Sequence, residues 1–325
     1  SGAVAYGGGA TGGTINIITR RPMPGEKTGQ AAVGYGSYGN GTMSAGLRLG
    51  GERAGLALHA NAQDAGNYRM NNRLRQQNLE GDLRLAGDRG TLAFKFGADD
   101  QNLGLPGSIS EAQLQADRRQ AATPRDFSSL RGWHAGLSGS HALAAGELAA
   151  DLNYRQRASS GSFFVGTPFF NKIDTQVNVL SFTPRIKFHH DRPEFGNTLV
   201  AGVDWEDWNL DRSAGPSIPG RPAASQRNGA LYLQDTLVIA GATSVMAGVR
   251  SQRSEYQVAD ALNPATGGTR SRTLNAFQAG LRHALTPDLS LYGKFGTSFR
   301  IPTVDELYNL FAATVTLLEP QHSRD

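Results

Sequence analysis

Cysteine is absent from all 325 residues of the chain. Without thiols, neither a disulfide framework nor a thiolate metal site can form. The lack of cysteine suits an oxidising exterior compartment without establishing one. Long hydrophobic runs are absent too, because the longest are a few residues, far short of the roughly 20 that a membrane-spanning helix needs. No basic segment with an apolar core follows Ser1, so any secretion signal is expected upstream.

The net charge of the chain is also small. The net charge is only +4 against 28 acidic residues, which is too little to indicate a nucleic-acid partner, and we expect none. Only 39% of the residues are hydrophobic, whereas glycine reaches 41 residues and helix-type periodicity is rare. This combination predicts many strands joined by turns.

A glycine-rich run, YGGGATGGTINIITRRP, covers Tyr6 to Pro22. Read from Gly7, it fits the G-x-G-x-x-G signature, and it fits the P-loop signature except that Gly13 replaces the lysine. Both signatures need a helix after the glycines, because the phosphate binds free N–H groups at a helix N-terminus. The TINIIT run that follows instead alternates β-branched residues, as strands do. We therefore predict a tight turn that leads into a strand, and no nucleotide site.

Downstream of Lys27, segments of about ten residues alternate apolar and polar side chains, as expected for tilted strands that cross a bilayer. In NTLVAGVDWEDW, one face carries Leu199, Ala201, Val203 and Trp205, and the other carries Gly202, Asp204 and Glu206. One face suits lipid and the other suits water. A soluble sandwich also alternates, so periodicity alone does not separate the two architectures.

The connections between strands do separate them. The strands are predicted near 28–38, 40–50, 54–63, 76–86, 91–99, 128–141, 147–157, 176–189, 197–209, 228–240, 244–255, 273–284 and 289–297. Short turns alternate with long connections near 64–75, 100–127, 158–175, 210–227 and 256–272. In an up-and-down barrel, this alternation puts the short turns on one rim and the long loops on the other, as in outer-membrane barrels.

Two motifs carry a family resemblance. The run from Tyr6 to Pro22 resembles the end of the plug domain of TonB-dependent outer-membrane receptors. Far downstream, GTSFRIPTVDELY, from Gly296 to Tyr308, resembles the "FRAP" segment of that family, and LEPQHSRD resembles its continuation. Both motifs in this order, with alternating strands between them, identify the chain as similar to the siderophore-receptor type of this family.

The resemblance implies an all-β fold, an antiparallel transmembrane β-barrel. The chain would be an interior fragment with about thirteen of the 22 strands, in which residues 1–24 form the C-terminal end of a plug and residues 25–325 the N-terminal part of the barrel. The implied function is active import across the Gram-negative outer membrane, with a ferric siderophore as the transported chelate. The implied partners are the TonB complex, whose contact segment this chain lacks, the chelate itself and outer-membrane lipid. No covalently bound cofactor, metal site or catalytic residue is expected.

Other functions remain as alternatives. An outer-membrane hydrolase would need a nucleophile motif such as G-x-S-x-G, and none of the seven histidines accompanies one. His189-His190-Asp191 is interpreted as part of a solvated periplasmic turn rather than a metal site. A haem receptor of this family usually carries a histidine in the stretch that here runs from Arg300 to Pro320, which has none, although His322 follows. A cobalamin receptor stays open, and a passive porin-like barrel would need no plug.

Candidate substrate contacts are predicted on the long-loop rim. Arginine stacks on aromatic rings and pairs with oxyanions, so arginines beside paired phenylalanines favour an anionic, aromatic chelate. The alternative is that these rings pack the loops or join the interfacial aromatic belt, with the arginines simply solvated. Trp205 and Trp208 are predicted as membrane-rim anchors. The candidate contacts are Arg118, Arg119, Arg125, Arg155, Arg157, Phe163, Phe164, Phe169 and Phe170.

Overall fold

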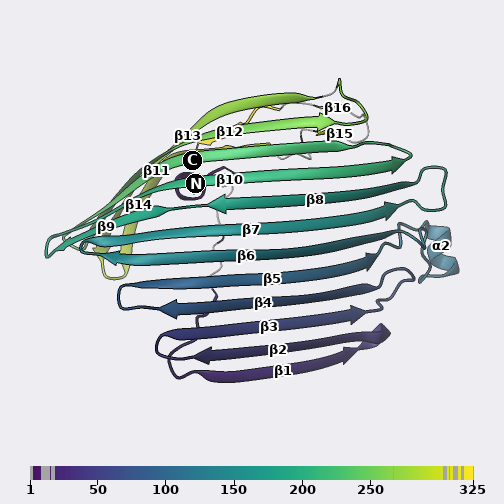
Figure 1. Ribbon diagram of the computed structural model, residues 1–325, viewed down its shortest axis with the longest axis horizontal. Coiled ribbons are helices and arrows are strands. Elements are labelled where there is room, and N and C mark those ends of the chain that lie inside the picture. Colours follow the sequence, from purple (N-terminus) through teal and green to yellow (C-terminus); the bar gives the residue numbers. More distant parts are fainter. Residues whose placement is uncertain are drawn as a thin grey trace.

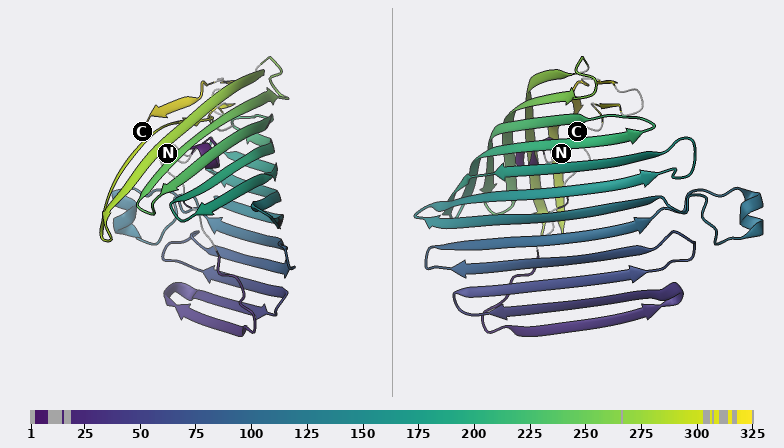
Figure 2. Two further views of the ribbon diagram at one scale, coloured as in Figure 1. Left: turned by 90° about the vertical axis from the view of Figure 1, so that its left-hand side faces the viewer. Right: turned by 45° about the vertical axis from the view of Figure 1, so that its right-hand side comes forward.

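One curved antiparallel sheet of 15 strands dominates the computed structural model (Figures 1 and 2). The structure describes residues 3–8, 15, 19–265, 267–302, 306, 308–309, 314–315 and 318–324. No helix in this described part is long and apolar enough to cross a membrane. The elements are α1 (Ala3–Tyr6), β1 (Lys27–Gly36), η1 (Ser37–Gly39), β2 (Asn40–Gly50), β3 (Ala54–Ala65), β4 (Leu74–Ala86), β5 (Gly90–Gly104), α2 (Glu111–Ala116), β6 (Phe127–Leu143), β7 (Gly146–Phe163), β8 (Asn171–Phe182), β9 (Arg185–Arg192), β10 (Phe195–Pro216), β11 (Pro222–Ile239), β12 (Thr243–Asp260), β13 (Gly268–Thr286), β14 (Leu289–Arg300), β15 (Tyr308–Asn309), β16 (Thr314–Val315) and β17 (Gln321–Arg324).

The strands follow one another around the sheet in chain order, which confirms the predicted up-and-down topology. One predicted strand, 176–189, is in fact divided into β8 and β9 around Pro184, because proline lacks an N–H group and restricts Thr183 before it. Both β8 and β9 pair with β7 and with β10, so the wall continues across this break. The long loops gather on one rim, at the end of the sheet where α2 lies in Figure 1.

The predicted loop bounds were wrong. The connection expected at 158–175 is only 164–170, and the one expected at 100–127 is 105–126, because β5, β7 and β8 extend further toward this rim. Near this rim apolar and polar residues no longer alternate along the chain, as in Ser159 to Phe163. The extended strand ends therefore had no periodic signal.

Two aromatic rings pack together on the outward face of β6 and β7. The Trp133 and Tyr154 rings lie 5.0 Å apart, and Trp133 Nε1 donates a hydrogen bond to Gln156 Oε1 at 2.6 Å. Toward the long-loop rim, the outward side chains become charged, as in the Arg131–Asp100 ion pair.

The two predicted tryptophan anchors lie on opposite faces of β10. Trp205 is 37% exposed on the outward face with Val203. Trp208 packs on the other face, against the buried cluster around Leu210 and Tyr256, so its predicted role as an anchor was wrong. Residues three apart in a strand must face opposite ways, because the side-chain period is two.

The N-terminal segment lies on the concave side of the sheet (Figure 2). Val4 of α1 is 1% exposed and packs against Leu274 and Phe299. Gly7 ends this helix at φ +75°, and a Cβ there would lie 2.8 Å from Arg250 Nη2, so a larger residue does not fit. Gly7 and Gly8 thus follow a short helix. The strand predicted over TINIIT lies largely outside the described residues.

Candidate functional site on the lumen wall

The concave face of the sheet is the lumen wall, and strand register shows which residues share one row of it. Arg155 pairs with Val179, which pairs with Trp208. Trp208 pairs with Gln226, Gln226 with Tyr256, and Tyr256 with Arg270. We call this line of directly opposed residues the Arg155–Arg270 row. Directly opposed residues of paired strands point to the same face, so two arginines border a stretch that contains two large aromatic rings.

An apolar group, here called the lumen cluster, occupies the middle of this row and its neighbours. Tyr256 and Val258 are each 1% exposed, and Leu210 is 4% exposed. Side chains that lie opposite one another on paired strands pack together, and these contacts stabilise the sheet. The lumen cluster consists of Leu210, Ala224, Tyr256 and Val258, with Val177 and Trp208 packed against them.

Arg155 and Arg157 lie on the lumen face of β7 at one edge of the cluster. Both are exposed, and within the described residues neither forms an ion pair. Arg155 directly follows Tyr154, whose ring packs against Trp133 on the outward face. The nearest acidic side chain on the row of Arg157 is Asp99, which leans over Gly132, the residue paired with Arg157.

The aromatic residues of the prediction lie just above this arginine pair. The Phe163 ring lies over Gly161 of the same strand, where a Cβ would come within 2.8 Å of it. Phe164 and Phe169 are 50% and 42% exposed, and their rings meet edge to face at 5.7 Å. Phe170 N–H donates a hydrogen bond to Ser217 Oγ at 2.8 Å. We call residues 164–170 the Phe loop.

Asp126, which the sequence analysis missed, fixes the Phe loop. Its carboxylate is buried and accepts hydrogen bonds from the Phe164 N–H at 2.7 Å and the Val165 N–H at 2.8 Å. Phe164 adopts φ +64°, which a non-glycine residue rarely does. Arg125, beside Asp126, places its guanidinium near Gly166 of the loop. A single aspartate in a polar connection gives no sequence signal of such a role.

Arg118 and Arg119 lie elsewhere. Arg119 donates a hydrogen bond from Nε to Tyr68 O at 3.0 Å, and its guanidinium lies 5.9 Å from the ring centres of Tyr38 and Tyr68. It ties the 105–126 loop to the β1–β2 hairpin and the β3–β4 loop. Arg118 is its exposed neighbour. The structure therefore gathers seven of the nine candidates around β7 and the Phe loop, and separates these two.

The same loops are held by two further polar residues. The Arg69 guanidinium donates to the carbonyls of Gly107 at 2.8 Å and Gln120 at 3.0 Å. Asn71 Nδ2 lies within hydrogen-bonding distance of the carbonyls of Leu105, Thr123 and Asp126. These contacts supply partners for carbonyls that a loop cannot pair by itself. Together with Arg119, these residues join the β1–β2 hairpin, the β3–β4 loop and the 105–126 loop into one framework beside the Phe loop.

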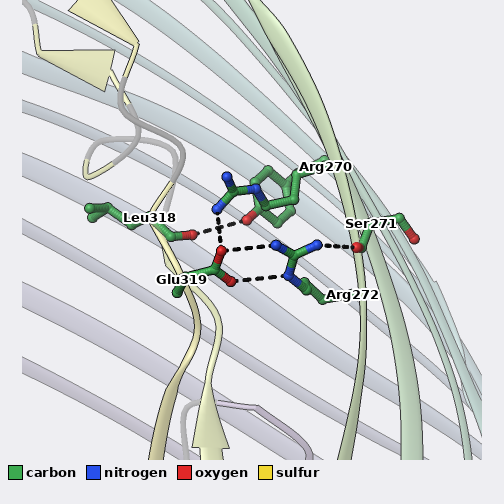
Figure 3. A network of polar contacts seen from close by, with 6 residues as sticks. Arg270, Ser271, Arg272, Leu318 and Glu319 are labelled. Carbon is green, nitrogen blue, oxygen red and sulfur yellow. Dashed lines mark hydrogen bonds and ion pairs between the residues drawn. The ribbon is translucent and has the colours of Figure 1, made fainter.

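A second arginine pair borders the cluster on β13 (Figure 3). Arg270 and Arg272 both bind the Glu319 carboxylate, and Tyr256 Oη donates to Leu318 O at 3.1 Å. Hydrogen bonds from Arg272 lower the pKa of Glu319 below its ordinary value.

The histidine pair considered as a metal site lies within β9 rather than in a turn. His189 Nδ1 contacts Thr198 Oγ1 at 2.9 Å, and Nε2 contacts Asp191 Oδ2 at 2.5 Å. The strand continues three residues beyond the predicted end at 189. No group of three or more metal-ligating side chains gathers anywhere in the described part of the chain.

Comparison with known proteins shows the family to which this chain belongs. The family model described as "TonB dependent receptor-like, beta-barrel" matches residues 31–325. The chain belongs to this family, whose members are transport receptors and not enzymes. No curated protein sequence matches the chain.

Solved structures share the fold at low sequence identity. The unliganded ferric citrate transporter FecA is 20% identical, with a TM-score of 0.82 over 100% of this chain and 52% of that one. The ferric-catecholate import receptor Fiu from E. coli K12 is 13% identical, with a TM-score of 0.78 over 92% and 58%. The ferric yersiniabactin uptake receptor FyuA from Yersinia pestis is 16% identical, with a TM-score of 0.77 over 93% and 52%. The chain thus spans about half the length of the structures it matches, and the predicted partial barrel is confirmed.

Proposed function

We propose that this chain is the plug end (residues 1–24) and the first part of the barrel (from residue 25) of a receptor that imports an anionic ferric chelate, a siderophore, across the Gram-negative outer membrane. Uptake depends on the TonB complex. The observation that carries the proposal is the exposed Arg155–Arg157 pair on the lumen wall, between the Phe loop and the lumen cluster. Guanidinium groups pair with oxyanions, while adjacent rings bind flat apolar parts of a ligand.

The position of the pair supports this assignment. A ligand arriving from outside meets the Phe loop first and the arginines next, before it reaches the depth of Arg250, which donates to the Val4 carbonyl of the N-terminal segment at 3.5 Å. The full gene product would add the remaining wall and plug. Family members with haem or cobalamin as cargo are the alternatives that the experiment separates.

The test is a growth panel of iron-starved cells that express the full gene product and receive siderophores, haem or cobalamin separately. We expect rescue by a ferric siderophore, and loss of rescue with a protonophore or without TonB while surface binding persists. Rescue by haem alone would remove the siderophore assignment, and uptake that continues without TonB would indicate a passive pore.

The arginine pair is tested by Arg155→Ala together with Arg157→Ala. Chelate binding should weaken by about 1–3 kcal/mol, the scale of hydrogen bonds to charged groups. Part of the loss should disappear at high salt, since charges in water are screened over about 8 Å at physiological salt. The matched control removes two outward arginines, Arg227→Ala with Arg253→Ala, and should leave binding unchanged.

A further inference from the structure

Glu319 occupies an arginine fork on the lumen wall. Arg272 binds it with two nitrogens, Nε to Oε2 at 3.0 Å and Nη2 to Oε1 at 2.8 Å, and Arg270 Nη1 adds a third contact at 2.9 Å (Figure 3). This is the fork geometry with which guanidinium recognises a carboxylate. The fork is therefore already a carboxylate site, and a segment of the protein fills it.

The fork belongs to the same surface as the candidate chelate site. Arg270 ends the row that starts at Arg155, and Tyr256 and Trp208 lie between them. Tyr256 joins both features, because its ring belongs to the lumen cluster while its hydroxyl binds the Leu318 carbonyl next to Glu319. Two arginine pairs thus face one apolar stretch from opposite sides. One pair is exposed, and the other has an internal carboxylate.

Resting on the proposed function, we propose that Arg270 and Arg272 are a second binding pair for a ferric chelate that presents a free carboxylate, and that Glu319 is an internal counter-ion which this carboxylate displaces. The chemistry of Glu319 itself selects the ligand class, because the group that the fork holds is a carboxylate. A catecholate complex presents aryl oxygens without this planar pair and gains less from the fork.

The displacement is feasible because the contact is exposed. The Glu319 side chain is 62% exposed, that of Arg272 is 41% exposed and that of Arg270 is 23% exposed. Ion pairs in such surroundings contribute little to stability, so an incoming carboxylate loses little by competing with this one. Without a competitor, Glu319 keeps the two like-charged guanidiniums together and the fork formed. The ligand then replaces one carboxylate by another and needs no rearrangement of β13.

The sign of the effect separates this role from a structural one. We expect Glu319→Gln in the full gene product, assayed in outer-membrane vesicles, to bind ferric citrate roughly fivefold more tightly, the equivalent of ~1 kcal/mol, the upper end for an exposed ion pair. Binding of a ferric tris-catecholate should change much less. Arg270→Ala with Arg272→Ala should weaken ferric citrate binding. The matched control is Glu306→Gln, which removes the same kind of contact from the exposed Arg300–Glu306 pair at 2.7 Å and should leave binding unchanged.

Unchanged or weaker ferric citrate binding by the Glu319→Gln receptor would overturn the inference, because a structural clamp can only lose affinity when it is broken. If that variant does not reach the membrane, Glu319→Asp replaces it, since it keeps the charge but shortens the reach, and it too must bind more tightly. A wild-type receptor that binds a ferric catecholate but not ferric citrate also overturns the inference and leaves the proposed function intact. A wild-type receptor that binds no ferric chelate removes both.

Discussion

Replacing Asp126 by asparagine tests whether one buried carboxylate holds the Phe loop. The carboxylate accepts two backbone N–H bonds, at 2.7 Å from Phe164 and 2.8 Å from Val165. An asparagine keeps one acceptor and turns an NH2 group toward the other donor. Each hydrogen bond to a charged group contributes about 1.5–3 kcal/mol, so losing one should weaken the loop by that amount.

Hydrogen exchange of the loop amides measures this change directly. Local opening sets the exchange rate, and 1.4 kcal/mol corresponds to a factor of ten, so the Phe164 and Val165 amides should exchange about tenfold to a hundredfold faster. Exchange in β12 should stay the same. The control is Asp88→Asn, because the Asp88–Arg53 pair is 83% and 73% exposed and its loss should have no measurable effect. Unchanged exchange in the Phe loop of the Asp126→Asn receptor would refute the assignment.

Three further changes concern how the N-terminal part meets the barrel wall. Asp204→Ala should lower the unfolding temperature, at a cost of about 3–5 kcal/mol, because it leaves the Arg250 side chain, 4% exposed, without its carboxylate; an unshifted temperature would mean that water already solvates this guanidinium. A hydrogen bond from the Met23 N–H lowers the pKa of Glu26 below its ordinary 4.5. This contact therefore stabilises the junction between the N-terminal segment and β1 fully above pH 4.5, and the stabilisation is lost as the pH falls through the lowered pKa. Protease cleavage near residue 23 should rise in that acid range, and Glu26→Gln should abolish the pH dependence; a variant that keeps the wild-type profile would exclude Glu26 as its source. Gly50→Ala should open the same junction at neutral pH, because a Cβ would lie 1.9 Å from the Met23 carbonyl oxygen; unchanged cleavage would contradict that close approach.

The strand topology could be predicted because it depends on a local and repeated signal. A strand with one face in lipid and the other in water must alternate apolar and polar residues. In such a strand the alternation ends where the strand leaves the bilayer. The alternation predicted the order of the strands and the rim that carries the long loops. It also correctly placed Leu199, Ala201, Val203 and Trp205 on one face. The bounds of the connection at 158–175 were wrong because Ser159 to Phe163 do not alternate in sequence, although they extend β7.

The site could be predicted only in part, because its residues meet through register and not through sequence. Arg155, Arg157 and Phe163 were found because they lie close together in sequence, at or just before a connection predicted on the long-loop rim. Placing Arg270 on the same row requires the register of five successive strand pairs to be known. A shift of one residue in any of these pairs would turn it to the other face. Glu319 was missed because it lies outside any strand, just before β17, so neither alternation nor register indicates its contact with β13.

The lumen arginines differ in how their charge is balanced, and this difference indicates where an anion gains most. Arg250 has Asp204, and the β13 pair has Glu319. Arg155 and Arg157 have no ion-pair partner within the described residues. Two carboxylates lean toward their edge of the wall: Asp99, over the Gly132 that pairs with Arg157, and Glu80, which contacts the His134 that pairs with Arg155. Two adjacent cations repel each other, so an anion that binds both removes that repulsion as well as forming its own contacts. An incoming carboxylate must displace Glu319 at β13, whereas within the described residues the β7 pair has no ion-pair partner to displace, so the β7 pair should bind first and the β13 pair second.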